Sequence, residues 1–108
     1  MEELIIKLQE LARLSPKYEI CGIISSSNSI YKISNVSKHP MNQFIFDKRE
    51  YFTCLNNLKN TGETVSYIFH SHPAGDPTPS KADLQFCKTS GIPQIIVSDK
   101  KYRVVTHA

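Results

Sequence analysis

Two histidines separated by one residue, at the end of an apolar stretch, constrain the fold more than any other feature of the chain. The stretch ETVSYIFH, residues 63–70, predicts a β-strand that ends at His70, and His72 follows two residues later. Side chains two apart on a strand point to the same side, so both imidazoles face one point. Neutral imidazole is a common zinc ligand, and a tetrahedral site needs about four donors. The strand end therefore predicts part of a metal site, and the alternative for the two histidines alone is a strand end with surface imidazoles.

A proline-rich loop, residues 73–79, leads from the histidines to a predicted helix, residues 80–88. Ser80 and Asp83 match a capping pair at the start of this helix, in which each side chain satisfies a backbone amide. Asp83 is also a candidate third metal ligand, because the loop has enough residues to bring the helix back over the strand end. The two roles of Ser80 do not exclude each other, since a capping hydroxyl still has a proton to offer a substrate.

Glu19 is a charged residue at the start of the otherwise apolar strand EICGII. Two histidines and one carboxylate leave a zinc coordination position open for water, as catalytic zinc requires. Hydrolysis of an amide then needs a group that takes a proton from water and passes it to the leaving amine, and Glu19 is the candidate. The alternative is that Glu19 marks a solvated strand end. Gly22 nearby allows a substrate or another strand to approach closely.

The remaining elements predict an α/β chain, with a mixed sheet covered by helices in an α+β or three-layer arrangement. In the helix that begins near residue 47, Asp47 is expected to cap the first turn and Glu50 to reach back. The other expected helix spans residues 2–14, and the other expected strands span 18–26, 30–36, 44–46, 94–98 and 102–106.

Length, charge and composition exclude several classes of protein. The 108 residues support one domain, with a net charge of +3 from scattered basic residues, which argues against nucleic-acid binding. The apolar runs are too short to span a bilayer. Two glutamates open the chain, unlike a secretory signal, so a cytoplasmic location is expected.

The cysteines and the two remaining histidines can also bind metals, but they are not expected to belong to the predicted metal site. The three cysteines are expected to be buried free thiols, although Cys21 is close enough to Glu19 on the same strand to be a possible zinc ligand. His39 is expected to be a solvated loop histidine, and His107 is spare.

Together, Glu19, HSHP and PSKAD resemble the JAMM (MPN-plus) metallopeptidase pattern, with the seven residues between His72 and Ser80 that this family has. The stretches FCKTSGIPQIIVSD and FIFDKREYF make the chain most similar to the bacteriophage tail assembly branch. The resemblance covers about residues 17–99.

This resemblance implies a deaminase-like α/β/α sandwich and a zinc-dependent peptidase or isopeptidase. By the same resemblance, His70, His72 and Asp83 would bind Zn²⁺, Glu19 would be the general base and then acid, and Ser80 would stabilise the oxyanion. The expected partners are a peptide or protein substrate and phage tail proteins, in tail assembly or cell-wall peptide cleavage. Two alternatives stay open: a non-catalytic assembly module that zinc stabilises, and a peptidase for ubiquitin-like protein tails.

Overall fold

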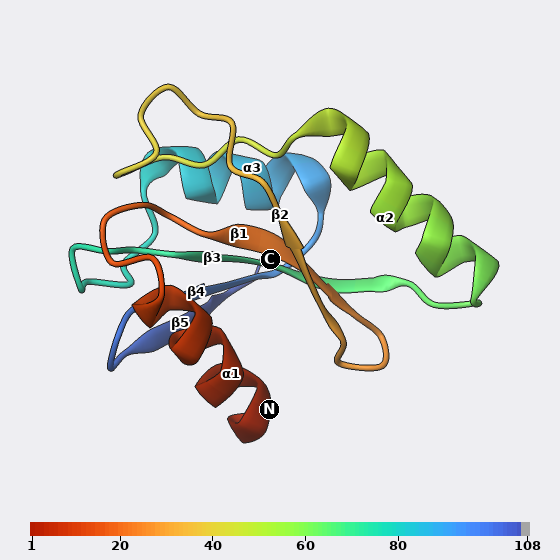
Figure 1. Cartoon of the computed structure of the whole chain (residues 1–108), viewed down its shortest axis with the longest axis horizontal. Helices are drawn as coiled ribbons and strands as arrows, with labels where there is room; N and C mark the ends of the chain where they lie inside the picture. The colour runs from red at the N-terminus through yellow and green to blue at the C-terminus, as the bar shows by residue number, and fades with distance from the viewer. Residues whose placement is uncertain (107–108) are drawn as a thin grey trace.

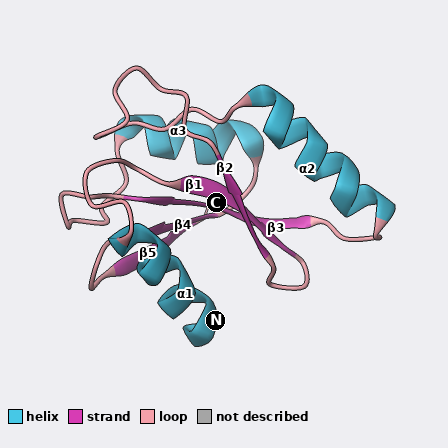
Figure 2. Ribbon diagram, viewed as in Figure 1, coloured by secondary structure: helices cyan, strands magenta, loops and turns pink. Residues whose placement is uncertain are grey.

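A five-stranded mixed sheet with the strand order β2-β1-β3-β4-β5 forms the centre of the computed structural model, which describes residues 1–106 (Figures 1 and 2). The strands β3 and β4 run parallel, and every other neighbouring pair runs antiparallel. The elements in chain order are α1 (Glu2–Arg13), β1 (Cys21–Ser25), β2 (Ile30–Ile33), α2 (Lys48–Asn60), β3 (Val65–Ser71), α3 (Lys81–Ser90), β4 (Gln94–Val97) and β5 (Tyr102–Val105).

The helices cover both faces of the sheet. Ile24 of β1 packs with Leu8 of α1, whereas its neighbour Ile23 packs with Leu58 of α2. Consecutive strand residues point to opposite faces, so α1 and α2 lie on opposite sides of the sheet. Helix α3 lies on the same side as α2 (Figure 1). The predicted mixed α/β fold with helices on both faces of the sheet is therefore confirmed.

The predicted helix ends are present, with one correction. The side chain of Asp47 accepts a hydrogen bond from the backbone N–H of Glu50 at 3.0 Å, as expected. The carboxylate of Glu50 does not reach back to Asp47 and instead accepts from the N–H of Ser34 at 2.9 Å. The reason is that the N–H of Asp47 already donates to the carbonyl of Ser34, so the helix needs no second cap there.

The segment 44–46 was expected to be a strand, and this prediction is wrong. Only Phe46 forms an isolated antiparallel bridge, with Asn35. The neighbouring Phe44 turns its ring onto His70, at a centroid separation of 4.6 Å. An aromatic contact at the sheet end thus replaces regular strand pairing in this segment.

Gly22 is required by close packing between strands. A Cβ atom at this position would lie 2.2 Å from the carbonyl oxygen of Tyr31 and 2.5 Å from the ring of Phe69. The space that the sequence left open for a substrate or a strand is thus filled by β2 and by Phe69.

A Gly22→Ala substitution is expected to lower the free energy of unfolding by about 1–3 kcal/mol, because the backbone of β2 has to move to admit the methyl group. Urea titration followed by circular dichroism measures this change. An unchanged midpoint would show that the contact between β1 and β2 is looser than the distances to Tyr31 and Phe69 imply.

All three cysteines are buried and free, as predicted. Within residues 1–106, no helix is both long and apolar enough to cross a bilayer, which agrees with the short apolar runs of the sequence.

Candidate functional site

The histidines lie where β3 leaves the centre of the sheet. His70 is fully buried between β1 and β4, opposite Cys21 on one side and Ile96 on the other. His72 follows the end of the strand and is partly exposed. Their Nε2 atoms are 3.1 Å apart, so the two imidazoles converge on one point, as the alternation of strand side chains predicts.

Asp83 completes a compact triangle with the two histidines. It is buried in the first turn of α3, and its Oδ2 atom lies 3.2 Å from Nε2 of His70 and 3.1 Å from Nε2 of His72. The same oxygen accepts a hydrogen bond from the N–H of Ser80, and the hydroxyl of Ser80 accepts from the N–H of Asp83. The expected capping pair is therefore present, and it also fixes the side chain of Asp83 toward the histidines.

The donor set fits a divalent metal ion. Nδ1 of His72 lies 2.9 Å from the carbonyl oxygen of Asp76, which can only accept, so Nδ1 carries the proton and Nε2 of the neutral ring presents a lone pair. That lone pair faces the carboxylate of Asp83, and two acceptors this close need a cation between them. Ligand atoms around tetrahedral zinc lie about 3.3 Å apart, close to the separations among the three atoms.

Without a metal, a proton serves as that cation. Burial lowers the pKa of His72, but hydrogen bonds to Asp83 and to the Asp76 carbonyl, with the charge of Glu19, outweigh it and raise this pKa overall. Burial lowers the pKa of His70, which is therefore neutral. Burial raises the pKa of Asp83, but the hydrogen bonds from both histidines outweigh it and hold this pKa well below its usual range. The metal-free site thus offers an ionised Asp83 carboxylate and a neutral His70 imidazole, and a metal ion would displace the proton that His72 holds.

Glu19 lies beside this triangle with a buried carboxylate. Its Oε1 atom has no hydrogen-bond partner among the described residues, and only 5% of the residue is exposed. A carboxylate oxygen of Glu19 and one ligand nitrogen from each of His70 and His72 all lie within 4.8 Å of one another. Burial raises the pKa of Glu19 to about 7, with His72 lowering it and Asp83 raising it. Such a pKa suits a group that accepts and then donates a proton near neutral pH.

The backbone of Glu19 is held by the loop that follows β2. Its N–H donates to the carbonyl of Pro40 at 2.7 Å, and its carbonyl accepts from Nδ2 of Asn35 at 3.0 Å. Glu19 thus lies two residues before the start of β1 at Cys21, and its backbone is not a loose solvated end.

Sequence reasoning missed the role of Ser71, the residue between the two histidines. Its hydroxyl accepts from the N–H of Ile20 at 2.9 Å, and its own N–H donates to the carbonyl of Ile20 at 3.0 Å. These two bonds tie the end of β3 to the residue after Glu19 and so set the spacing between Glu19 and the histidines. Alternation along the strand points Ser71 away from the imidazoles, and this is why it did not stand out as a ligand.

Phe44 was also missed. Its ring stacks on the imidazole of His70 at 4.6 Å with an interplanar angle of 28°, and Nδ1 of His70 has no hydrogen-bond partner among the described residues. Packing against Phe44 and the contact of Nε2 with Asp83 therefore orient His70, whereas the Asp76 carbonyl holds Nδ1 of His72.

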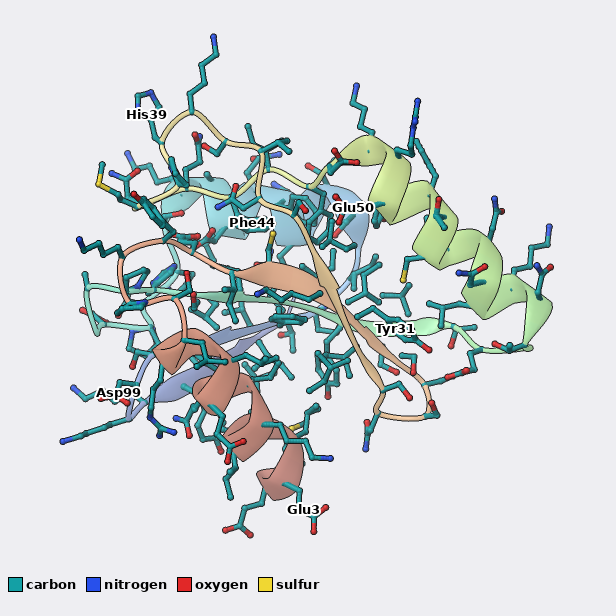
Figure 3. All side chains as sticks on the ribbon, viewed as in Figure 1. Glu3, Tyr31, His39, Phe44, Glu50 and Asp99 are labelled. Carbon is teal, nitrogen blue, oxygen red and sulfur yellow. The ribbon has the colours of Figure 1, made fainter. Side chains whose placement is uncertain are left out.

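The other candidate side chains lie outside the site. The thiol of Cys21 is fully buried 3.3 Å from the carbonyl of Ile33, and burial, with the charges of Glu19 and Glu50, raises its pKa to about 12. A thiol with this pKa stays protonated and is a poor ligand. His39 is exposed on its loop and points away from the sheet (Figure 3), and His107 lies outside the described residues.

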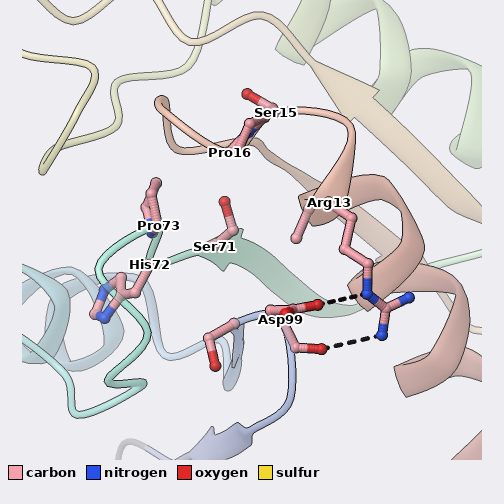
Figure 4. A pocket seen from close by; sticks show the side chains of 9 residues that line it. Arg13, Ser15, Pro16, Ser71, His72, Pro73 and Asp99 are labelled. Carbon is pink, nitrogen blue, oxygen red and sulfur yellow. Dashed lines mark hydrogen bonds and ion pairs between the residues drawn. The ribbon is translucent and has the colours of Figure 1, made fainter.

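Two cavities of about 350 Å³ each adjoin the cluster. One adjoins His72 and includes Ser71 and Pro73, with the ion pair between Arg13 and Asp99 on its wall (Figure 4). The other includes Glu19, and Ser15 lines both. There is thus open space next to His72 and next to Glu19.

The chain is similar to several known proteins. It is 25% identical to a desampylase from Haloferax volcanii over 90% of this chain and 74% of that protein. It is 34% identical to a UPF0758 protein from Enterococcus faecalis over 75% of this chain, but it spans only 34% of that longer protein. The predicted phage tail branch is not shown by these relatives and stays a prediction.

Two solved structures share the fold. A solution structure of a protein from Desulfitobacterium hafniense matches with a TM-score of 0.76 and 23% identity, over 96% of this chain and 78% of that one. The crystal structure of a JAB1/MPN domain protein from Archaeoglobus fulgidus matches with a TM-score of 0.65 and 20% identity, over 96% and 84%. At these identities the likeness shows the fold alone. The family model for prokaryotic homologs of the JAB domain matches residues 1–107, and the chain therefore belongs to that family.

Proposed function

We propose that residues 1–108 form one zinc-dependent metallopeptidase domain that hydrolyses a peptide or isopeptide bond. His70, His72 and Asp83 hold the metal, Glu19 transfers the proton and Ser80 stabilises the oxyanion. One observation carries this proposal: two Nε2 atoms and Oδ2 of Asp83 converge within 3.2 Å of one another, beside a buried carboxylate that has no partner among the described residues.

The chain's own residues account for the proton transfers. When bound, zinc supplies Lewis acidity, which polarises the scissile carbonyl and lowers the pKa of water to about 7. The carboxylate of Glu19 accepts a proton from the attacking water and then delivers it to the leaving amine. The hydroxyl of Ser80 accepts from the N–H of Asp83, so its own proton is free to donate to the carbonyl oxygen as negative charge develops there.

The proposed substrate is a peptide or a protein. The desampylase relative supports this class, and so do the two cavities, which leave room for a peptide chain next to His72 and next to Glu19. A ubiquitin-like tail and a cell-wall stem peptide both have the required amide. Phage tail proteins stay a predicted partner class on the sequence resemblance only.

Metal removal tests the proposed function. The metal-free protein is expected to cleave none of a panel of linear peptides, isopeptide-linked conjugates and peptidoglycan stem peptides. Addition of one equivalent of zinc is expected to restore cleavage of at least one class, as measured by mass spectrometry of the products. If zinc binds but the panel stays uncut, the proposed hydrolysis is contradicted.

A second candidate function is favoured by the proximity of Glu19. Its carboxylate lies near enough to His70 and His72 to be considered a fourth ligand. Four protein ligands would make a closed structural zinc site, which would only tie α3 to β3. Zinc affinity distinguishes the catalytic site from the structural site. Removal of the Glu19 carboxylate weakens zinc binding if Glu19 is a fourth ligand, but not if it is a general base.

The loop after the histidines gives a further prediction. The Oδ1 atom of Asp76 accepts from the N–H of Thr78 at 2.9 Å and from its hydroxyl at 2.7 Å, which fixes the carbonyl that orients His72. An Asp76→Ala variant is expected to bind zinc about 10-fold more weakly, at the low end of effects on residues that orient metal ligands. Asp76→Asn keeps the Oδ1 acceptor and is expected to bind like the wild type. Titration against a chromophoric chelator measures both affinities, and equal values for Asp76→Ala and wild type would contradict this role.

A further inference from the structure

Gln94 is a buried polar residue in the centre of the sheet. It begins β4, its exposed fraction is 0%, and apolar residues follow it along the strand. Its Nε2 atom donates to the backbone carbonyl of Asp83 at 2.9 Å, and its Oε1 atom has no partner among the described residues. The amide nitrogen of Gln94 is thus hydrogen-bonded from β4 to α3, whereas the amide oxygen has no partner among the described residues.

This hydrogen bond joins the sheet to the helix at the candidate ligand itself. Gln94 pairs with Ile68 of β3, two residues before His70, and it reaches the first turn of α3 where Asp83 lies. The capping pair with Ser80 orients the side chain of Asp83 within the helix but does not set the distance between helix and sheet. The hydrogen bond from Gln94 connects the sheet, which positions His70, with Asp83 of α3.

Folding alone does not explain this amide. In an α-helix the carbonyl of Asp83 already accepts from the backbone N–H four residues later, so it needs no second donor. The unpaired Oε1 atom costs free energy that an apolar side chain of the same size would avoid. Core packing alone therefore does not account for an amide at this position.

We infer that Gln94 is a positioning residue, which holds Asp83 at ligand distance from His70 and His72. This inference rests on the proposed function, since it assumes that the triangle binds zinc. Gln94 does not touch the metal, the substrate or Glu19 in this role. It acts through the backbone of Asp83, and its loss is therefore expected to affect metal affinity more than folding.

A Gln94→Met variant tests the inference, because methionine has nearly the same shape but no amide. It is expected to bind zinc about 10–100-fold more weakly than the wild type in competition with a chromophoric chelator. The thermal midpoint of its metal-free form is expected to equal or exceed that of the wild type. Gln94→Leu is a second apolar variant. Ile95→Met is the matched control, since Ile95 is equally buried in β4 but packs with the α1 core, and it is expected to keep wild-type affinity.

The outcomes separate the inference from the proposed function. If the wild type binds no zinc, the proposed function fails and the inference fails with it. If the wild type binds zinc and both Gln94 variants bind it equally well, only the inference is overturned. If the metal-free variants unfold at much lower temperature than Ile95→Met, or do not fold, Gln94 is a structural residue and the inference is likewise overturned.

Discussion

A Glu19→Gln variant is expected to lose hydrolysis by about 10²–10⁴-fold while it keeps zinc and stability, because the amide cannot accept a proton from water. The side chain is buried with an unpartnered oxygen, so glutamine fits the same space without a new unpaired charge. Steady-state kcat/KM on a substrate from the panel measures the loss. Glu10→Gln, at an exposed position of α1, is the matched control and is expected to keep wild-type kcat/KM.

Zinc stoichiometry and thermal unfolding of the same variant make the result decisive. If Glu19→Gln loses zinc, Glu19 is a fourth ligand and the site is structural. If the variant unfolds, the residue serves the fold, and its proposed role in proton transfer is wrong.

A His72→Ala variant is expected to weaken zinc binding by more than about 100-fold, above the range that changes in supporting residues cause. It removes one of three converging donors, and the partly exposed position of His72 limits the damage to the core. In the wild type, free zinc at 100 times its Kd is expected to stabilise the fold by about 2.7 kcal/mol. This zinc-dependent rise in unfolding free energy is expected to vanish in His72→Ala.

His39→Ala is the control for that experiment, because His39 is an exposed histidine on a loop. Its zinc affinity and its zinc-dependent stability are expected to match those of the wild type. Equal loss in both variants would show that zinc binds at the surface through scattered histidines, against the proposed centre.

Local sequence signals predicted much of this molecule. The two-residue spacing of His70 and His72 gave their common direction, and the serine–aspartate spacing gave the cap of α3. The left-handed Gly91, with φ of 69°, ends α3 at Ser90, two residues beyond the predicted end at residue 88. Each of these features depends on residues that lie within a few positions of one another, so chain geometry alone links the pattern to the structure.

Tertiary contacts explain what the sequence did not predict. Ser71 bonds to Ile20 and Gln94 bonds to Asp83 across separations of 51 and 11 residues, and no spacing rule relates them. Glu50 has the right position to cap its own helix, but the nearby N–H of Ser34 takes its carboxylate. The only sequence signal for the role of Gln94 was its polar side chain directly before the apolar residues of β4.

A crystal structure of the zinc-loaded protein, with anomalous scattering measured at the zinc edge, tests the central claim most directly. One ion is predicted at about 2.0–2.2 Å from Nε2 of His70, Nε2 of His72 and a carboxylate oxygen of Asp83, with a fourth position that no protein atom occupies. An ion bound elsewhere, or one that the carboxylate of Glu19 closes off as fourth ligand, would contradict the account.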